Sequence, residues 1–376
     1  MSFCGLLATS CIKDEPLNSE CDIEICKVHH DTPDAIFYTV SDTLQGVSSA
    51  DTVITFFTRS NIRPEDLSEV RVTFALTPGA TITPANGSVQ DFSQGDVVYT
   101  VKSEDNLWHR VYRVRFVPMA ILNPVFDFET VELEQPKERY YSWYAYDQDG
   151  MRQELWATGN SGFALSRSSA KPDEYPSVAI EHGLVGKGVK LETCNTGPFG
   201  VMVNMRIAAG NLFLGSFDTQ NALKDAMKAT QFGVPVNRKP VRFTGYYKFQ
   251  PGETFQDRYG IEVPGRVDAP DAYAVLYKNT DESGRPVTLY GDDVLTHPNI
   301  VALARVSDFK VTGITDDDVW EHFDLPLEYK HDLDPDLLRN FGYSLAVVFT
   351  SSIEGANFCG AVGSTLLVDE SSIIYE

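Results

Sequence analysis

Short runs of β-branched and aromatic residues, separated by turn-forming residues, recur along most of this 376-residue chain. In the first third, we expect strands at Ile36–Val40, Val53–Phe57, Val70–Leu76, Asp96–Lys102 and Arg110–Val117. Turns of the Pro-Gly and Asn-Gly type lie between them, and the last run alternates apolar with charged residues, which indicates one buried and one wet face. The count and spacing predict an immunoglobulin-like sandwich over residues 31–120.

The same pattern continues from Asn123-Pro124 to Glu376, where most of the aromatic residues lie. We expect strands at Gly188–Glu192, Val201–Ala208, Val241–Phe249, Ala272–Asn279, Asn299–Arg305, Trp320–Leu325, Tyr343–Thr350 and Thr365–Asp369. One helix is expected at Asn221–Ala229. So many strands with almost no helix predict a sandwich, barrel or jelly roll over residues 121–376, and disfavour a β/α enzyme.

The charge balance narrows the classes of partner. The chain has 53 acidic and 31 basic residues and a formal net charge of −22, so it would be repelled by nucleic acid and by anionic lipid headgroups. We therefore expect no nucleic-acid partner. A neutral polysaccharide meets no such repulsion, although solubility alone also selects for acidic surfaces.

The N-terminus resembles a bacterial lipoprotein signal, with Leu7, Ala8, Thr9 and Ser10 leading to Cys11. We expect residues 1–11 to be this signal, Cys11 to be lipidated, and residues 12–30 to be a tether. Several acyl chains on one cysteine would give a lasting membrane anchor. No Lys or Arg precedes Lys13, which is unusual for a secretory signal, and an unmodified start with a chance cysteine is the alternative.

Ile12-Lys13-Asp14-Glu15 follows Cys11 and resembles a short signal that sends lipoproteins to the outer face of the outer membrane in some Gram-negative anaerobes. The expected location is therefore the cell surface. Cys21 and Cys26 can form a local disulfide in such an oxidising compartment, whereas buried free thiols are equally compatible with Cys194 and Cys359. No cysteine or histidine spacing is that of a zinc site.

Four stretches of the second domain resemble one known family. They are Trp156-Ala-Thr-Gly-Asn-Ser-Gly162, Ala208-Ala-Gly-Asn-Leu-Phe-Leu-Gly-Ser-Phe217, Gly245-Tyr-Tyr-Lys-Phe-Gln-Pro-Gly252 and Gly360-Ala-Val-Gly-Ser-Thr-Leu-Leu-Val-Asp-Glu370. In this order they resemble the putative carbohydrate metabolism domain of surface lipoproteins of gut bacteria. The resemblance implies a C-terminal β jelly roll similar to carbohydrate-binding modules, preceded by an immunoglobulin-like domain. It assigns no reaction.

Sugar binding needs flat aromatic faces and planar polar side chains in an open groove. Trp156 and Asn160, in a glycine-flanked turn, are the first candidates, with buried packing as the alternative for Trp156. Alternation along Val241–Phe249 and Ala272–Asn279 predicts polar or aromatic side chains on the faces turned from the core. The further candidates are Arg242, Tyr246, Lys248, Tyr273, Tyr277 and Trp320.

We expect no cofactor, and a structural calcium ion is the bound ion that the sequence allows. Jelly rolls often bind calcium where their first and last strands meet, which in this chain would bring together Asp127, Glu129 and Asp369. Carboxylate oxygens are the ligands that calcium prefers.

Three function classes follow. The first is a surface lipoprotein that binds a poly- or oligosaccharide during carbohydrate acquisition, alongside protein partners of a glycan-uptake system. The second is a glycoside-active enzyme, which needs two carboxylates about 5 to 10 Å apart in one cleft. The third is a structural or adhesive protein that binds another protein through an exposed apolar patch. The family resemblance and the supply of aromatic residues both favour glycan binding, and no motif selects catalytic residues.

Overall fold

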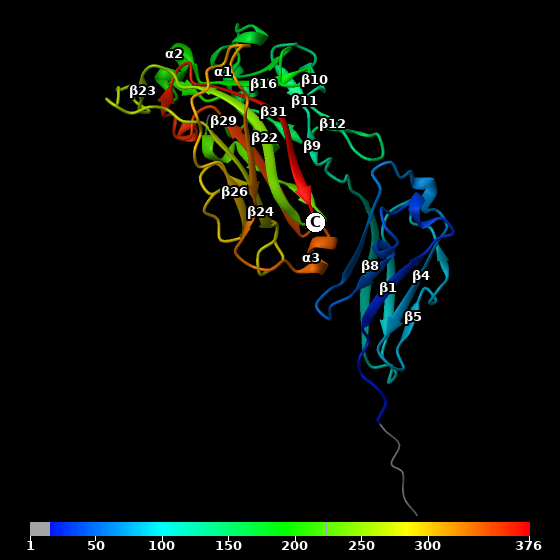
Figure 1. The fold of residues 1–376 in the computed structure, drawn as a ribbon. Coiled ribbons are helices and arrows are strands. Elements are labelled where there is room, and N and C mark those ends of the chain that lie inside the picture. Colours follow the sequence, from blue (N-terminus) through cyan, green and yellow to red (C-terminus); the bar gives the residue numbers. More distant parts are fainter. Residues whose placement is uncertain (1–15, 223) are drawn as a thin grey trace, which may run out of the picture. The chain divides into compact units, whose positions relative to one another are not determined.

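The computed structural model describes residues 16–222 and 224–376. They form two compact units, which divide between Met119 and Ala120 (Figure 1). The predicted signal and its Cys11 lie outside the described residues. Within the described ranges, no helix is long and apolar enough to cross a membrane.

The first unit is a sandwich of two four-stranded sheets. One sheet has the order β2 (Leu44–Gly46), β1 (Ile23–His29), β4 (Val70–Leu76) and β6 (Val89–Gln90). The other has the order β3 (Val53–Thr58), β8 (His109–Pro118), β7 (Val97–Lys102) and β5 (Thr81–Thr83). Residues of the longer strands are buried between the sheets, among them Phe56, Val72 and Tyr112. Three 3-10 turns complete the unit: η1 (Pro33–Ala35), η2 (Val40–Thr43) and η3 (Pro64–Leu67).

Two predictions for this unit are wrong. The expected tether contains β1, an inner strand whose Cys26 is fully buried; the charged Glu24 and Lys27 on its exposed face hid the pattern. The expected strand Ile36–Val40 does not form; η1 ends just before this segment and η2 begins at its last residue. The possible Cys21–Cys26 disulfide is also absent, because Cys21, Cys26, Cys194 and Cys359 are all free thiols.

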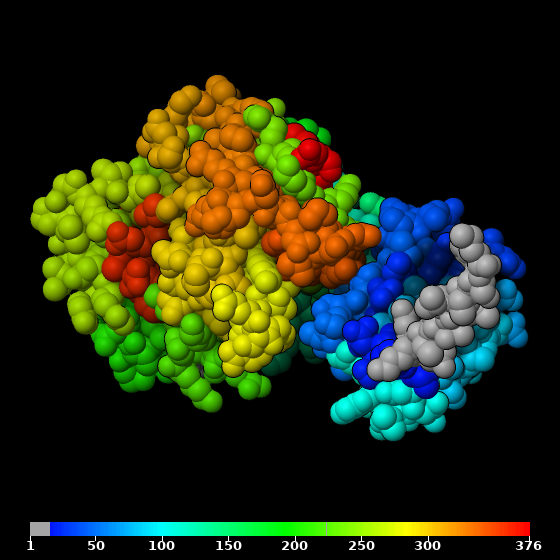
Figure 2. Space-filling model, turned by 90° about the horizontal axis from the view of Figure 1, so that it is seen from below, coloured from blue at the N-terminus to red at the C-terminus, as the bar shows by residue number. Residues whose placement is uncertain are grey.

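The second unit is a larger sandwich. Its nine-stranded sheet has the order β25 (Leu289–Tyr290), β20 (Thr230–Phe232), β19 (Asn211–Phe217), β29 (Tyr343–Thr350), β24 (Asp271–Lys278), β26 (Ile300–Arg305) and β28 (Glu328–Tyr329). In addition β14 (Trp156–Ala157) pairs with β19, and β21 (Val234–Val236) pairs with β29. The segments after β24, coloured yellow to orange, form the surface at one end of this unit in Figure 2.

A six-stranded sheet packs against the nine-stranded sheet. Its order is β15 (Ser177–Ile180), β16 (Gly188–Glu192), β31 (Thr365–Tyr375), β22 (Pro240–Gln250) and β27 (Glu321–Pro326), with β9 (Val125–Phe126) on β31. The core between the sheets contains Leu212, Ala272 and Val347 of the larger sheet and Leu191, Phe243 and Val368 of the smaller one. The all-β prediction, with a sandwich related to the jelly roll, is therefore confirmed.

Short elements complete the second unit. The two-stranded ribbons are β10 (Val131–Leu133) with β11 (Tyr141–Trp143), β12 (Ala145–Tyr146) with β13 (Arg152–Gln153), β17 (Cys194–Asn195) with β18 (Ile207–Ala208), and β23 (Phe255–Gln256) with β30 (Gly360–Ala361). The helices and turns are α1 (Asn160–Ser166), α2 (Gly197–Met202), α3 (Pro335–Arg339), η4 (Pro172–Glu174), η5 (Ala226–Lys228) and η6 (Gly355–Asn357). β27 of the six-stranded sheet and β28 of the nine-stranded sheet follow each other in the chain, with Leu327 between them.

Two element predictions for the second unit are wrong. The expected strand Val201–Ala208 begins in α2, which Pro198 initiates, and only Ile207 and Ala208 are extended in β18. The expected helix Asn221–Ala229 contains only the 3-10 turn η5 in its described part. By contrast, β31 continues through Ser371 and Ser372, which pair with β9, to Tyr375.

The central strands β24 and β29 are buried along almost their whole length. A strand with one wet face would show alternating exposure, so both faces of the nine-stranded sheet are covered at its centre. One face meets the six-stranded sheet. The other packs against Phe232, Leu289 and Val294, which come from β20, β25 and the segment after it.

Candidate functional site

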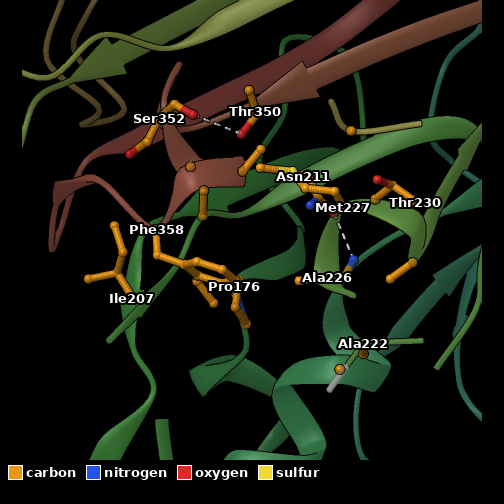
Figure 3. Close-up of a pocket in the computed structure, with 18 of the residues that line it drawn as sticks. Pro176, Ile207, Asn211, Ala222, Ala226, Met227, Thr230, Thr350, Ser352 and Phe358 are labelled. Atoms are coloured by element: carbon orange, nitrogen blue, oxygen red, sulfur yellow. Dashed lines mark hydrogen bonds between the residues drawn. The ribbon is translucent and has the colours of Figure 1, made fainter. Parts of the chain in front are cut away.

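A cavity of about 270 Å³ opens over the nine-stranded sheet, on the face turned away from the six-stranded sheet (Figure 3). Phe213, Tyr273 and Val348 line it, and each alternates along its strand with a residue of the core between the sheets. Because successive side chains of a strand point to opposite faces, this alternation fixes the side on which the cavity lies. The cavity is larger than a second hollow of this unit, which lies beside Trp156.

A row of polar side chains crosses neighbouring strands at one end of the cavity. Thr350 of β29 is paired in register with Asn211 of β19 on one side and with Asp271 of β24 on the other. Arg305 of β26 lies next to Asp271, to which its Nε and Nη2 donate hydrogen bonds of 2.9 and 2.7 Å. The row therefore brings an amide, a hydroxyl and an ion pair to the cavity.

The ion pair has two opposed influences on the carboxyl of Asp271. Burial raises the pKa of Asp271, and hydrogen bonding to Arg305 partly offsets this effect. The same hydrogen bond raises the pKa of Arg305. Because both carboxylate oxygens are held by one guanidinium, the pair presents little net charge to a ligand.

Some hydrogen-bonding groups at the cavity have no protein partner among the described residues. The Tyr273 hydroxyl makes no hydrogen bond to them, and burial raises its pKa, so it is a neutral donor. Asn211 Oδ1 accepts a 2.7 Å hydrogen bond from the Gly159 backbone N–H, whereas its Nδ2 has no such partner. These groups are available to a polar ligand.

The walls of the cavity are largely apolar. Phe163 comes from α1, Phe199 from α2, Phe217 from β19 and Met227 from η5. A Cβ on Gly162 would lie 3.1 Å from the Phe217 ring, so a glycine at this position lets α1 pack against that wall. Figure 3 shows Ala222, Ala226, Pro176 and Phe358 around the same space.

A buried hydrogen-bond network holds the segment that carries Phe358 to the cavity. Asp268 Oδ2 accepts hydrogen bonds from Ser352 Oγ (2.6 Å), Ser364 Oγ (2.8 Å) and the Ala361 N–H (2.7 Å). Ser352 Oγ also lies 2.6 Å from Thr193 Oγ1. These bonds tie the chain after β29 to the segments before β24 and β31, so this wall is preorganised.

Two predicted sugar-binding residues have structural roles in place of the expected open groove. Trp156 is partly buried and packs edge-on against Phe126 and Phe128 of the core between the sheets, with ring centroids 5.1 and 5.6 Å apart. Asn160 is fully buried at the start of α1. Its Nδ2 donates to Ser177 O (2.8 Å) and its Oδ1 accepts from Ser177 N (3.1 Å), so both ends of the amide are occupied.

The tyrosines of β24 lie on the expected face, but that face is covered. Tyr273 is buried and lines the cavity. Tyr277 is buried beneath β20, where its hydroxyl donates a 2.7 Å hydrogen bond to Phe232 O. The alternation of residues along β24 predicted the face of the sheet on which both side chains lie. It did not predict that this face is covered, because the covering segments come from distant parts of the chain.

The remaining candidates lie on the six-stranded sheet and its edge, not at the cavity. Arg242 pairs with Asp324 (2.8 Å), and the Tyr246 ring lies 4.6 Å from the His322 ring. Lys248 was expected to be exposed, but it is 3% exposed, because its Nζ donates to Thr315 O (2.7 Å) and lies 5.2 Å from the centre of the Trp320 ring.

The carboxylates of the predicted calcium ligands accept hydrogen bonds from backbone N–H groups in the structure. Asp369 Oδ2 accepts from the N–H groups of Leu184 (2.7 Å) and Val185 (3.0 Å), and Glu129 Oε1 accepts from Lys187 N (2.9 Å). Asp127 Oδ1 accepts from Glu129 N (3.3 Å). The described residues contain no group of three or more acidic, His or Cys side chains arranged for a metal. The calcium ion stays a prediction.

The residues of the polar row were not selected from the sequence. Asp271 precedes the apolar run of β24, and Arg305 ends the apolar run of β26. For each of these two residues, the position of a charge at the end of a buried strand was a signal in the sequence. Nothing in the spacing showed that the two strands are neighbours, which is a property of the sheet order.

Comparison with known proteins adds to this geometry. The model of the family described as "Putative carbohydrate metabolism domain" matches residues 127–374, which is more than half of the chain. The chain belongs to this family. A second model, described as "SGBP, N-terminal", matches residues 38–115. The cavity and its polar row thus lie in the putative carbohydrate metabolism domain.

Two solved structures are similar to this member of the family. One is described as a putative glycoside hydrolase from Bacteroides thetaiotaomicron, with 37% identity, a TM-score of 0.63, and coverage of 97% of this chain and 99% of the other. The other is described as a putative glycoside hydrolase from Bacteroides vulgatus, with 34% identity, a TM-score of 0.62, and coverage of 69% of this chain and 100% of the other. Among curated protein sequences, no match was found.

Proposed function

We propose that this chain is a lipid-anchored protein of the cell surface that binds glycan in the cavity over the nine-stranded sheet. The observation that carries the proposal is the combination of aromatic walls with unpaired hydrogen-bond donors in one cavity. Phe199 and Phe217 offer ring faces, while the Tyr273 hydroxyl and Asn211 Nδ2 offer donors. A sugar ring has apolar C–H faces and polar hydroxyl edges, which match these two kinds of surface.

The volume of the cavity limits how much of a glycan it can hold. Small-molecule sites usually measure about 300 to 1,000 Å³, and this cavity of about 270 Å³ is at the lower end. It accommodates one sugar unit and not a long stretch of polysaccharide. We therefore propose that the cavity binds a chain end or a side branch of a glycan.

The family supports a role in carbohydrate metabolism, and the match of the first unit to an "SGBP, N-terminal" model is consistent with it. The Cys11 motif in the sequence supports the anchor at the outer membrane. In this proposal the first unit lies between the anchor and the cavity-bearing unit along the chain. The protein would act in carbohydrate acquisition, together with protein partners of a glycan-uptake system.

Hydrolysis of a glycosidic bond is the second candidate, favoured by the descriptions of the two similar structures as putative glycoside hydrolases. Such enzymes generally use two carboxylates that flank the bond. Among the described residues that line the cavity, Asp271 is the one carboxylate, and Arg305 binds both of its oxygens. This arrangement supports binding in the cavity more than catalysis.

The test is a glycan array with the full chain, followed by calorimetry on the glycans that bind. Tyr273→Phe removes one hydroxyl from the cavity without changing its walls, and we expect affinity to fall about two- to tenfold. Tyr277→Phe is the matched control, because the same change on the same strand removes a hydroxyl that does not line the cavity. Absence of binding across a broad array would reject the proposal. Equal affinity of both variants and the parent protein would reject this site.

A further inference from the structure

Three large apolar side chains are exposed at the end of the first unit where the described chain begins. Leu17 is 59% exposed, Leu107 is 78% exposed and Trp108 is 62% exposed. Leu107 and Trp108 lie in the turn between β7 and β8, which we define as the tip turn, Ser103–Trp108. Of the four tryptophans, Trp108 is the one that is more exposed than buried, whereas large aromatic side chains are usually mostly buried.

The tip turn is held in one conformation by its own hydrogen bonds. Ser103 N donates to Trp108 O (3.1 Å), and Ser103 Oγ accepts from Trp108 N (3.1 Å). Asp105 Oδ1 accepts from Leu107 N (2.9 Å), and Asn106 adopts a left-handed φ of 60°. The backbone therefore presents the two apolar side chains to solvent as a fixed feature, and a partner would meet a preorganised surface.

The beginning of the chain runs beside this turn. Asn18 N donates to Glu104 Oε2 (2.9 Å), and Asp105 N donates to Asn18 O (3.2 Å). Asn18 is seven positions after Cys11 in the sequence. A chain spans at most about 3.6 Å per residue, so an anchor seven positions before Asn18 is at most about 25 Å of chain away from it. Figure 1 shows the dark-blue start of the described chain at this end of the first unit.

We propose that the tip turn, together with Leu17, contacts the lipid bilayer in which Cys11 is anchored. This inference rests on the proposed anchor, which brings the membrane surface within reach of this end of the unit. Tryptophan is favoured at membrane interfaces because its ring is apolar and its N–H is polar. The net charge of −22 disfavours anionic lipid, so the contact is with zwitterionic headgroups and is insensitive to salt.

The test uses the full chain, purified from bacterial membranes and reconstituted in phosphatidylcholine vesicles with or without brominated acyl chains. Bromine quenches tryptophan fluorescence only at close range. We expect brominated lipid to quench the parent protein more than Trp108→Phe, whose remaining signal comes from Trp143, Trp156 and Trp320. Leu107→Asp retains Trp108 and should reduce the quenching. Cys11→Ser tests the anchor and should leave the protein unbound to the vesicles.

The outcomes separate the two proposals. If the parent protein is bound to vesicles but is quenched no more than Trp108→Phe, the tip-turn contact is overturned and the anchor stands. If the chain with intact Cys11 does not associate with membranes, the anchor is overturned and the tip-turn contact fails with it. If the extra quenching disappears in high salt, the contact is electrostatic and the proposed apolar contact is wrong.

Discussion

Arg305 holds both carboxylate oxygens of Asp271 at one end of the cavity, with N···O distances of 2.9 and 2.7 Å. The Asp271 side chain is 5% exposed and that of Arg305 is 36% exposed, so one partner is buried and the other reaches solvent. The pair joins β24 to β26 and sets the charge of the cavity.

Asp271→Asn should lower the free energy of unfolding by about 2 kcal/mol, because a charge-assisted pair of hydrogen bonds to a buried carboxylate is lost. Asp324→Asn is the control, since Asp324 also pairs with an arginine but both side chains are about 40% exposed. Exposed pairs contribute about 0 to 1 kcal/mol. Urea denaturation measures both values. Equal losses in the two variants would contradict this account of the pair.

Asn160→Ala should also destabilise the protein, by about 1 to 3 kcal/mol, because Ser177 N–H and C=O would lose their partner in a buried place. Thermal unfolding of the second unit measures the effect. Ser161→Ala is a neighbouring control, because Ser161 is only part-buried and its hydroxyl contacts one other hydroxyl, that of Thr219. An unchanged melting temperature for Asn160→Ala would mean that the amide is not a structural link.

Asp369 should make stability depend on pH. Burial raises the pKa of Asp369 to about 6 in the folded protein, above the value of about 3.9 for an unfolded chain. The folded state therefore binds this proton more tightly. The stabilising contribution is complete below about pH 4 and is lost as the pH rises through about 6.

We expect the free energy of unfolding to fall less between pH 4 and pH 7 in Asp369→Asn than in the parent protein, since the amide does not titrate. Denaturant titrations at several pH values measure this difference. Asp324→Asn serves again as the control, because hydrogen bonding to Arg242 lowers the pKa of Asp324. If Asp369→Asn and the parent protein have the same pH dependence, Asp369 does not have a raised pKa.

The thiols give a chemical prediction. Cys21 and Cys26 are free, and burial raises the pKa of Cys26, so it should react slowly in the folded protein. Alkylation in denaturant without a reductant should modify both residues, which mass spectrometry can detect in the peptide that ends at Lys27. A peptide that is alkylated only after reduction would show that the two cysteines form a disulfide.

The sequence predicted the strands whose burial alternates or is continuous, such as β4, β22 and β29, because the pattern of apolar residues is local. It did not predict β1, where only Ile23, Cys26 and Val28 are buried. The apolar positions there are few and are separated by charged residues, so the period of two was hidden.

The site was harder to predict than the fold, because its residues are brought together by the order of the strands. Asn211, Asp271, Arg305 and Thr350 are far apart in the sequence and become neighbours only in the nine-stranded sheet. Lys248 shows a related effect. Its partners Thr315 and Trp320 lie in a distant loop, and a register shift between Thr244 and Tyr246 changes the simple alternation of β22.

Binding of glycan to a protein whose cavity has been filled tests the central claim most directly. Ala226 lines the cavity, so Ala226→Phe should occupy part of its volume of about 270 Å³. Ala50→Phe makes the same change at an exposed position of the first unit. With a glycan that binds the parent protein, we predict that Ala226→Phe lowers affinity at least tenfold, about 1.4 kcal/mol, while Ala50→Phe leaves it unchanged. A folded Ala226→Phe protein with the affinity of the parent would contradict the claim that glycan binds in this cavity.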